Sequence, residues 1–325
     1  MLGKLFLCNI LAMSSLCAGK DQLPGARLCT SKPGISWDSS DVHVVFIGDS
    51  LTRYQFLATT YRIHFQKTIP MDRSLVNEKM FDSWSDFYRK TTTIFSGSMK
   101  CDCFRYERGE RKKKFTFSFS RENRFFSFSL HCKHSPPQRF LFTFIQYFGD
   151  VPSLHGRIFP SSIKEARPSK RQKKSIWSYD NLSSALKNFV GQMQKTPTHI
   201  VINVGCWPHI KVMQELKSAM LIANNLTSKV YWKETSPSKA YALSSGNSSR
   251  KYPKDIDKLA KQYCKSFKLC KYIKFPSTIP SHLLTDDENI PEYLDNIHFS
   301  SPYLYVFWSK KLFKEMDLNI LDELL

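Results

Sequence analysis

The stretch VHVVFIGDSLTRYQ, residues 42–55, decides the fold. It begins with an apolar run that ends at Gly48-Asp49-Ser50, and such a run is typical of a buried strand in a parallel sheet. After the serine the period changes, and apolar side chains recur at helical spacing on one face: Leu51, Tyr54, Leu57, Ala58, Tyr61 and Phe65. The stretch therefore predicts a strand, a tight turn and a helix in direct succession.

This order places Ser50 at the carboxyl end of the predicted strand, just before the predicted helix. Open α/β sheets bind their ligands at that edge. The first turn of a helix offers free N–H groups and the positive end of the helix dipole, and both favour a developing oxyanion. Gly48 accepts a tight turn without a side-chain clash. Ser50 is therefore a candidate nucleophile.

Strands and helices are predicted to alternate from residue 178 onward. Strands are expected at residues 199–204, 229–232 and 272–275, and helices at 182–193, 209–226, 253–267 and from Ser301-Pro302 onward. The inner face of the third of these helices is expected to hold Ile256, Leu259, Ala260, Tyr263 and Phe267. This alternation predicts an α/β fold with a parallel sheet covered by helices.

The region before residue 178 has a different pattern. Residues 115–120 and 125–130 are rich in alternating phenylalanines, and the polar Arg121-Glu122-Asn123-Arg124 separates them. We therefore expect a β-hairpin with a polar turn, followed by a strand at residues 140–148. The basic stretch at residues 161–174 is interpreted as a solvated loop, with polyanion binding as the alternative, and another basic run lies at residues 108–114.

The amino terminus has the pattern of a cleaved secretory signal at residues 1–19. A short basic start precedes a mostly apolar run at residues 5–16, and the small residues Ala18 and Gly19 follow. The alternatives are an uncleaved anchor or an apolar terminal strand. Residues 20–41 are expected to be an irregular lead-in, and residues 42–325 a single domain with an insertion at about residues 66–175. No membrane span is expected beyond the signal.

Cysteines and sequons support a secretory compartment. Seven cysteines follow the signal, so at least one is expected to be free or intermolecular: Cys29, Cys101, Cys103, Cys132, Cys206, Cys264 and Cys270. Cys264 and Cys270 are spaced to close a small loop, and a zinc site is the competing interpretation, although the chain has no CxxC pair. N-glycosylation is predicted at Asn181, Asn225 and Asn247.

A serine nucleophile needs a base, and the base needs a partner that orients it. Among nine histidines, His298 is the best placed, because it lies just before the last predicted helix and three positions after Asp295. Asp295 could then reach Nδ1 of the imidazole while Nε2 faces Ser50. In isolation, a DxxH sequence is more often an incidental surface loop.

Four blocks occur in a fixed order: GDSLTRYQ, NVGCW, WKETSP and DNIH. Together they resemble the SGNH/GDSL hydrolase superfamily, and more closely its PC-esterase branch. That branch includes the trichome birefringence-like polysaccharide O-acetyltransferases and the lumenal domain of sialic-acid O-acetyltransferases. The resemblance covers residues 42–316 and is loose between 66 and 175. It implies a three-layer α/β/α, flavodoxin-like parallel sheet, into which the β-hairpin is inserted.

The resemblance also implies roles for individual residues. Ser50 would form an acyl-enzyme, His298 would act as base and then acid, and Asp295 would orient His298. The backbone N–H of Ser50, together with Gly205 and Asn203, would hold the oxyanion, although the superfamily spacing Gly-x-Asn is inverted here as Asn-x-Gly. Support of the site is assigned to Asp49, Arg53 and Trp207. Their alternative roles are a turn or cap, a surface charge and core packing, respectively.

The resulting hypothesis is a secreted or ER/Golgi-lumenal glycoprotein that transfers or hydrolyses a carbohydrate O-acyl group, with acetyl as the expected group. No metal and no cofactor are expected. The formal charge of +20 favours an acidic glycan as substrate. Two alternatives stay open: a catalytically inactive glycan-binding protein on an esterase scaffold, and a basic secreted protein that binds nucleic acid.

Overall fold

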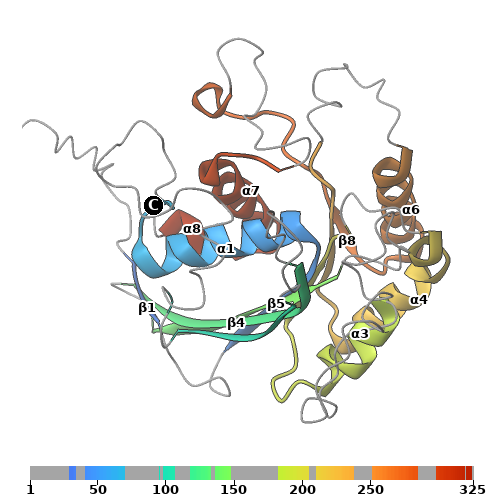
Figure 1. Cartoon of the computed structure of the whole chain (residues 1–325), viewed down its shortest axis with the longest axis horizontal. Helices are drawn as coiled ribbons and strands as arrows, with labels where there is room; N and C mark the ends of the chain where they lie inside the picture. The colour runs from blue at the N-terminus through green and yellow to red at the C-terminus, as the bar shows by residue number, and fades with distance from the viewer. Residues whose placement is uncertain are drawn as a thin grey trace, which may run out of the picture.

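The protein is described here from a computed structural model of the whole chain (Figure 1). The structure describes residues 29–33, 41–69, 95, 98–106, 118–132, 136–147, 182–204, 210–237, 251–284, 298–318 and 320–323. The predicted signal, the basic runs at residues 107–114 and 164–174, and Asp295, Gly205 and Trp207 lie outside the described residues.

One eight-stranded mixed sheet forms the centre of the fold. Its strands are β1 (Cys29–Pro33), β2 (Val42–Gly48), β3 (Met99–Tyr106), β4 (Ser118–Cys132), β5 (Gln138–Gln146), β6 (His199–Ile202), β7 (Val230–Lys233) and β8 (Lys271–Ile273). They lie in the order β1-β4-β5-β2-β6-β7-β8, and β3 also pairs with β4. The pairs from β5 to β8 are parallel, whereas β4 is antiparallel to β1, β3 and β5.

The five mutually parallel strands reverse their order at one point. Numbered along the chain, β2, β5, β6, β7 and β8 lie in the spatial order 2-1-3-4-5. The reversal therefore falls between β2 and β6, whose register pairs Ile47 with Ile202. In open α/β sheets, ligands bind at such a point, outside the carboxyl ends of the strands. Ser50 follows β2 at this edge.

Helices cover both faces of the sheet (Figure 1). On one face lie α1 (Ser50–Phe65), α7 (Pro302–Glu315) and α8 (Ile320–Glu323), which share a core with Phe46, Phe142 and their neighbours. On the other lie α3 (Leu182–Asn188), α4 (Ile210–Leu226) and α6 (Lys251–Phe267), packed on alternate residues such as Val45 and Ile47. The predicted α/β fold is thus confirmed, with the sheet as its middle layer.

The alternating phenylalanines of β4 and β5 explain the packing of the first face. Phe126 and Phe128 on β4 and Phe140, Phe142 and Phe144 on β5 are all buried in the core beneath α1 and α7. Phe128 stacks on Phe140 with ring centroids 5.0 Å apart. Because side chains alternate across a strand, the period of two in the sequence becomes one aromatic layer on one face.

The predicted polar turn at Arg121–Arg124 is wrong. These residues lie inside β4, which runs without interruption from Ser118 to Cys132. The hairpin partner of β4 is instead β3, which precedes it in the chain and pairs with it antiparallel. Arg124 is fully buried, and its Nη1 lies 3.6 Å from the sulfur of Met99 on β3. Pairing on both edges of β4 has thus overridden a sequence that is typical of a turn.

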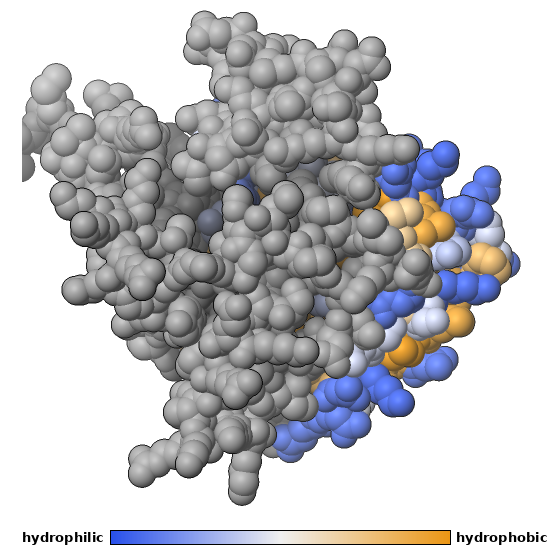
Figure 2. Space-filling model, turned by 45° about the vertical axis from the view of Figure 1, so that its right-hand side comes forward, coloured by the Kyte–Doolittle hydropathy of each residue, from blue (hydrophilic) through white to orange (hydrophobic). Residues whose placement is uncertain are grey.

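The helix predicted at residues 253–267 is α6, and it begins two residues earlier, at Lys251. Ile256 and Ala260 on its inner face are buried. Phe267, also expected there, is 48% exposed, and Lys217 Nζ of α4 lies 4.3 Å from its ring centroid. The face that carries α4 and α6 accordingly mixes apolar and charged side chains at its surface (Figure 2). Within the described residues, we find no helix whose length and apolar character would let it cross a membrane.

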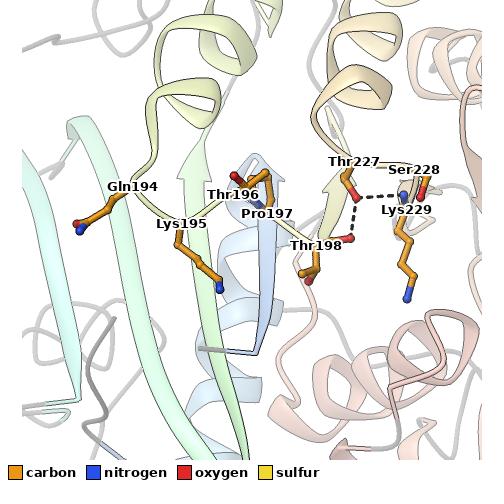
Figure 3. A pocket seen from close by; sticks show the side chains of 8 residues that line it. All are labelled: Gln194, Lys195, Thr196, Pro197, Thr198, Thr227, Ser228 and Lys229. Atoms are coloured by element: carbon orange, nitrogen blue, oxygen red, sulfur yellow. Dashed lines mark hydrogen bonds between the residues drawn. The ribbon is translucent and has the colours of Figure 1, made fainter. Parts of the chain in front are cut away.

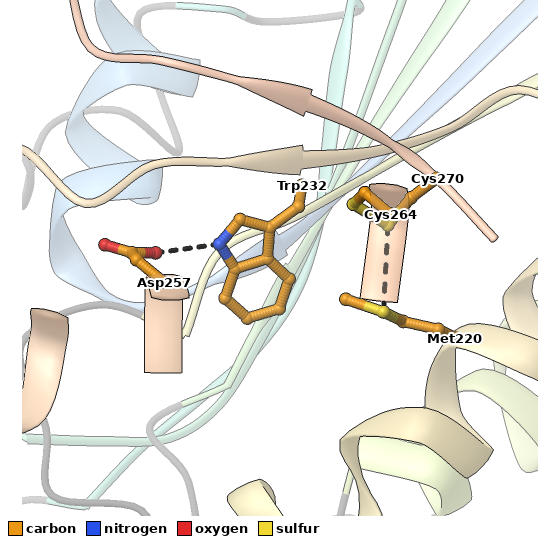
Figure 4. Close-up of a disulfide and its surroundings, with 5 residues drawn as sticks. All are labelled: Met220, Trp232, Asp257, Cys264 and Cys270. Carbon is orange, nitrogen blue, oxygen red and sulfur yellow. Dashed lines mark hydrogen bonds between the residues drawn. A yellow bond between two sulfur atoms is a disulfide. The ribbon is translucent and has the colours of Figure 1, made fainter. Parts of the chain in front are cut away.

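The predicted small loop between Cys264 and Cys270 is confirmed as a disulfide (Figure 4). It joins the end of α6 to the residue before β8, and Met220 of α4 contacts Cys270 with its sulfur 3.7 Å away. Because these two sulfurs are bonded to each other, neither is a zinc ligand. Cys132 at the end of β4 is also disulfide-bonded.

Candidate active site

Ser50 occupies the first position of α1, directly beyond the end of β2. Asp49 caps this helix, because its Oδ1 accepts the backbone N–H of Leu51 at 3.0 Å. The turn has no room for a larger residue at position 48. A Cβ on Gly48 would collide with Thr52 Oγ1 and would lie 2.6 Å from the backbone oxygen of Asn203. The sequence GDS therefore brings the serine close to the end of β6, at the point where the strand order reverses.

The hydroxyl of Ser50 lies within hydrogen-bond distance of the imidazole of His298. Ser50 Oγ lies 2.6 Å from His298 Nε2, a hydrogen-bond distance between residues 248 positions apart. Ser50 is only 8% exposed, and His298 is half-buried. When Nε2 carries no proton, the serine hydroxyl donates to it, and the imidazole can then take the proton as the oxygen attacks an electrophile.

The aromatic rings of α1 and α7 hold His298 in place. The Tyr54 ring meets the imidazole edge to face, with centroids 5.1 Å apart, and also contacts Tyr305 of α7. The hydroxyl of Tyr305 accepts the backbone N–H of Phe299 at 3.2 Å. The residue after His298 is thus fixed to α7, while the ring of His298 itself rests on α1.

Arg53 belongs to the buried part of α1. It is 9% exposed, and its guanidinium carbon lies 4.9 Å from the Tyr54 ring centroid. Its backbone N–H donates to Asp49 O at 2.9 Å. The interpretation of Arg53 as a surface charge is therefore wrong. Its contact with Tyr54 places it beside the ring that packs on His298.

Asn203 is fully engaged inside the protein. Its Nδ2 donates to Lys233 O at 2.8 Å and to Thr235 Oγ1 at 3.1 Å, so both amide hydrogens have acceptors. Its Oδ1 accepts from Thr52 Oγ1 at 3.3 Å, and it is 1% exposed. In this arrangement the side chain of Asn203 ties β6, β7 and α1 together and has no N–H left for an oxyanion.

The segment after β7, in the block WKETSP, is anchored by two carboxyl groups, the half-buried Glu234 and the buried Asp257. Glu234 accepts from Tyr272 Oη at 2.8 Å and from the Phe275 N–H at 2.7 Å. Asp257 accepts from Trp232 Nε1 at 2.7 Å (Figure 4) and from the Thr235 N–H at 3.1 Å. Burial raises the pKa of Asp257 to about 7, and the nearby Glu234 adds to that shift, although these two hydrogen bonds oppose it.

The sequence did not single out Asp257, Tyr305 or Lys233, although Lys233 lies within the WKETSP block. Lys233 and Tyr305 contact residues of α1 far away in the chain, and Asp257 contacts Trp232 and Thr235. Each resembles an ordinary helix or strand residue in its local context. The only signal that could have found Lys233 is its position: a charged residue directly after the apolar Val230, Tyr231 and Trp232 of a buried strand.

The predicted orienting role of Asp295, the oxyanion role of Gly205 and the supporting role of Trp207 fall on residues outside the described part, and they stay predictions. Of the three sequons, Asn225 is described. It is exposed near the end of α4, whereas Asn181 and Asn247 lie outside the described residues.

A cavity of about 560 Å³ lies at the amino-terminal ends of the parallel strands, whereas Ser50 lies at their carboxyl ends (Figure 3). Residues 194–198 and 227–229 line it, just before β6 and β7 begin. It is therefore separated from Ser50 by the length of the strands. Thr227 Oγ1 donates to Thr198 O at 2.8 Å there and holds the two lining segments together.

Among the described residues, no three His, Cys, Asp or Glu side chains are grouped closely enough to hold a metal ion. No family model matches the chain, and neither a curated protein nor a solved structure matches it at a significant level. The assignment of a function therefore depends on the geometry of the site and on the sequence motifs.

Proposed function

We propose that the protein is a serine enzyme of the SGNH/GDSL type, close to the PC-esterase branch, that moves or removes an O-acetyl group on a carbohydrate. The observation that carries this proposal is the contact of 2.6 Å between Ser50 Oγ and His298 Nε2. A serine and a histidine from distant parts of the chain converge at the reversal point of the sheet. That is where the proposed family would place its nucleophile and base.

The architecture supports the same proposal. The order 2-1-3-4-5 of the parallel strands is that of flavodoxin-like sheets, and helices cover both faces. This is the α/β/α arrangement expected of an SGNH hydrolase. The antiparallel β4 and the outer β1 and β3 extend the sheet beyond these five parallel strands. Since one fold hosts many activities, the strand order supports the class, and the site supports the reaction.

The chemistry proceeds in two balanced steps. Ser50 Oγ attacks the carbonyl carbon of the acyl donor while His298 Nε2 takes the hydroxyl proton. The donor's alkoxide then leaves with that proton, and the acyl group stays on Ser50. In the second step a sugar hydroxyl or a water molecule gives its proton to His298 and attacks the acyl carbon. Ser50 leaves and regains the proton, and the product is a new ester or free acetate.

The negative charge that develops on the carbonyl oxygen needs N–H donors. The backbone N–H of Ser50 lies in the first turn of α1, where helical N–H groups have no helical acceptor. A single such donor contributes about 3 kcal/mol to stabilising the transition state. Because the amide hydrogens of Asn203 are engaged elsewhere, we assign the second donor to the neighbourhood of Gly205. Asp295 is proposed to orient His298.

The proposed setting is the secretory pathway or the cell exterior. The signal pattern at residues 1–19, the sequons and the disulfide between Cys264 and Cys270 support it. The positive charge of the chain supports an acidic glycan as the acceptor or substrate. No cofactor is part of the proposed mechanism.

The decisive experiment is labelling with a fluorophosphonate probe, combined with acetate release from a generic acetyl ester. We expect the intact protein to be labelled at Ser50, and Ser50→Ala to lose both labelling and acetate release while its circular dichroism is unchanged. Ser228→Ala is the matched control, because Ser228 is exposed at the opposite edge of the sheet. Failure of the intact protein to react would overturn the proposal and favour a glycan-binding protein on an inactive scaffold.

A further inference from the structure

Lys233 is a fully buried lysine at the end of β7. Lysine is almost never fully buried unless it is paired, because removing its amino group from water costs free energy. Its position is on the same sheet edge as Ser50, since the carboxyl ends of the parallel β2, β6 and β7 lie together. Burying this amino group costs free energy of folding, and Lys233 lies beside the proposed site, so its position needs a physical explanation.

The amino group of Lys233 reaches both helices that build the site. Its Nζ donates to Gln55 Oε1 at 2.7 Å and to Thr52 Oγ1 at 3.2 Å, both in the first two turns of α1. It also lies 4.0 Å from the ring centroid of Trp308 on α7, a cation–π distance. Ser50 begins α1, and His298 lies just before α7. One side chain therefore touches the helix that carries the proposed nucleophile and the helix that follows the proposed base.

The backbone of Lys233 closes a ring of hydrogen bonds. Its carbonyl oxygen accepts from Asn203 Nδ2, Asn203 Oδ1 accepts from Thr52 Oγ1, and Thr52 Oγ1 accepts from Lys233 Nζ. Thr52 belongs to α1, Lys233 is the last residue of β7, and Asn203 directly follows β6. Because each bond fixes two of the three positions, the ring sets where the first turn of α1 lies relative to the ends of the two strands.

We propose that Lys233 is a positioning residue of the Ser50 site, which holds the first turn of α1 and the middle of α7 so that Ser50 Oγ and His298 Nε2 stay in contact. This inference rests on the proposed function and adds a residue to it. Catalysis is sensitive to such positioning, because a shift of about 1 Å costs about 10²-fold in rate. A cation near the N-terminus of α1 also favours the oxyanion, since charges interact strongly where water is excluded.

The competing explanation is that Lys233 only stabilises the fold. The two explanations differ in what they expect of Lys233→Met, which keeps the length of the side chain and its packing on Trp308 but removes the donors and the charge. Replacing buried charged groups with apolar ones of similar volume is often neutral for stability. A folded variant with an impaired site is therefore attainable.

We would measure the steady-state hydrolysis of p-nitrophenyl acetate, fluorophosphonate labelling rates and thermal unfolding for the full chain and its variants. Lys233→Met is expected to lower kcat about 10- to 100-fold, as a shift of less than 1 Å would, with KM little changed. Its rate of fluorophosphonate labelling at Ser50 is expected to fall with kcat, because both reactions need Ser50 Oγ in contact with His298 Nε2. Lys229→Met is the matched control, since Lys229 is exposed directly before the start of β7, far from Ser50, and should behave as wild type.

Thr52→Val tests the same ring without touching the lysine. It keeps the shape of Thr52 and removes the hydroxyl that joins Lys233 to Asn203, so kcat is expected to fall there as well. If Lys233→Met fails to fold, Thr52→Val decides the question. An active wild-type protein whose folded variants keep the wild-type kcat and labelling rate would overturn this inference alone. A wild-type protein that neither reacts with the probe nor releases product would overturn the proposed function, and the role of Lys233 with it.

Discussion

Ser50 Oγ and His298 Nε2 lie 2.6 Å apart although 248 positions separate the two residues in the chain. The contact exists because α1 packs against α7 on one face of the sheet, where Tyr54 of α1 contacts both His298 and Tyr305 of α7. It is a hydrogen bond formed by tertiary packing rather than by local sequence. The site is therefore sensitive to any change that alters the position of α1.

His298→Asn is predicted to remove the proposed base while keeping a polar side chain of moderate size. Loss of general acid–base catalysis should lower kcat by about 10² to 10⁴-fold, because a positioned proton acceptor typically contributes that much. The measurement is acetate release from a generic ester, with a thermal melt to show that the variant folds. The half-buried position makes a large loss of stability unexpected. Unchanged turnover in His298→Asn would remove His298 from the mechanism.

Gly48→Ala is predicted to damage both the fold and the site. The new Cβ would collide with Thr52 Oγ1 and lie 2.6 Å from Asn203 O, so β2, α1 or β6 must move. Overpacking of this kind costs about 1–3 kcal/mol in the free energy of unfolding. Gly191→Ala is the matched control, because its Cβ would have its nearest contact, Leu186 O, at 3.4 Å. Urea denaturation of both variants tests the difference, and equal stabilities would contradict it.

His43 is predicted to make the protein less stable in acid. Its Nδ1 contacts Lys195 O and its Nε2 contacts Thr143 Oγ1, both at 2.9 Å, and burial lowers its pKa from 6.5 to about 4. The unfolded chain therefore binds a proton between pH 6.5 and 4 that the native protein excludes. The stabilising effect is complete above pH 6.5 and is lost as the pH falls toward 4.

The test for His43 is the free energy of unfolding as a function of pH. The pKa shift of His43 accounts for at most about 3 kcal/mol of the fall in stability between pH 6.5 and 4. In His43→Asn this part of the fall should be absent, so that the free energy of unfolding depends less steeply on pH. His282→Asn, at an exposed position, serves as the control and should keep the wild-type slope. A slope in His43→Asn equal to that of the wild type would show that another group causes the acid sensitivity.

Asp257 is predicted to have the opposite effect to His43: its contribution to stability is lost as the pH rises. Burial raises its pKa from 3.8 to about 7, so the native protein binds a proton that the unfolded chain releases between these values. Its contribution to stability is therefore complete below about pH 4 and decreases as the pH rises toward 7. Asp257→Asn keeps an acceptor for Trp232 Nε1 but loses the acceptor for the Thr235 N–H.

The test for Asp257 compares the free energies of unfolding of Asp257→Asn and of the wild type at two pH values. At pH 5 the variant should be less stable than wild type, by about 1 kcal/mol for the lost hydrogen bond. At pH 8 the deficit should shrink or reverse, because the wild-type protein then contains a buried carboxylate. Chemical denaturation at both values gives the two differences directly. A deficit that grows from pH 5 to pH 8 would mean that the Asp257 carboxylate stabilises the native protein.

Local patterns predicted the elements around Ser50 well. The apolar run before Gly48 and the change of period after it correspond to β2 and α1, and the predicted alternation after residue 178 corresponds to the elements from α3 to α7. The failure at Arg121–Arg124 has a physical reason. Four polar residues in a row favour a turn, but here β3 pairs with the whole segment and β5 pairs with Asn123 and Arg124. Pairing partners are a property of the fold and leave no trace in the local sequence.

The site was predictable only in part. The contact between Ser50 and His298 was predictable because each residue belongs to a recognisable block. Asn203 was singled out for its position, but its contacts differ from the expected oxyanion role. Lys233 was not predictable as a site residue, because its partners lie 178 and 181 positions away on α1. A charged residue at the end of a strand usually reaches water, and only the packed structure shows that this one does not.

The distance along the chain between Ser50 and His298 also has a consequence for biosynthesis. A ribosome that has made β2 and α1 must add most of the domain before it makes His298, which follows Ser50 by 248 residues. The serine thus emerges long before its partner, and a nascent or truncated chain carries the hydroxyl without the imidazole. Under the proposed mechanism, reactivity would begin only after α7 has docked, so translation itself would delay the appearance of an active enzyme.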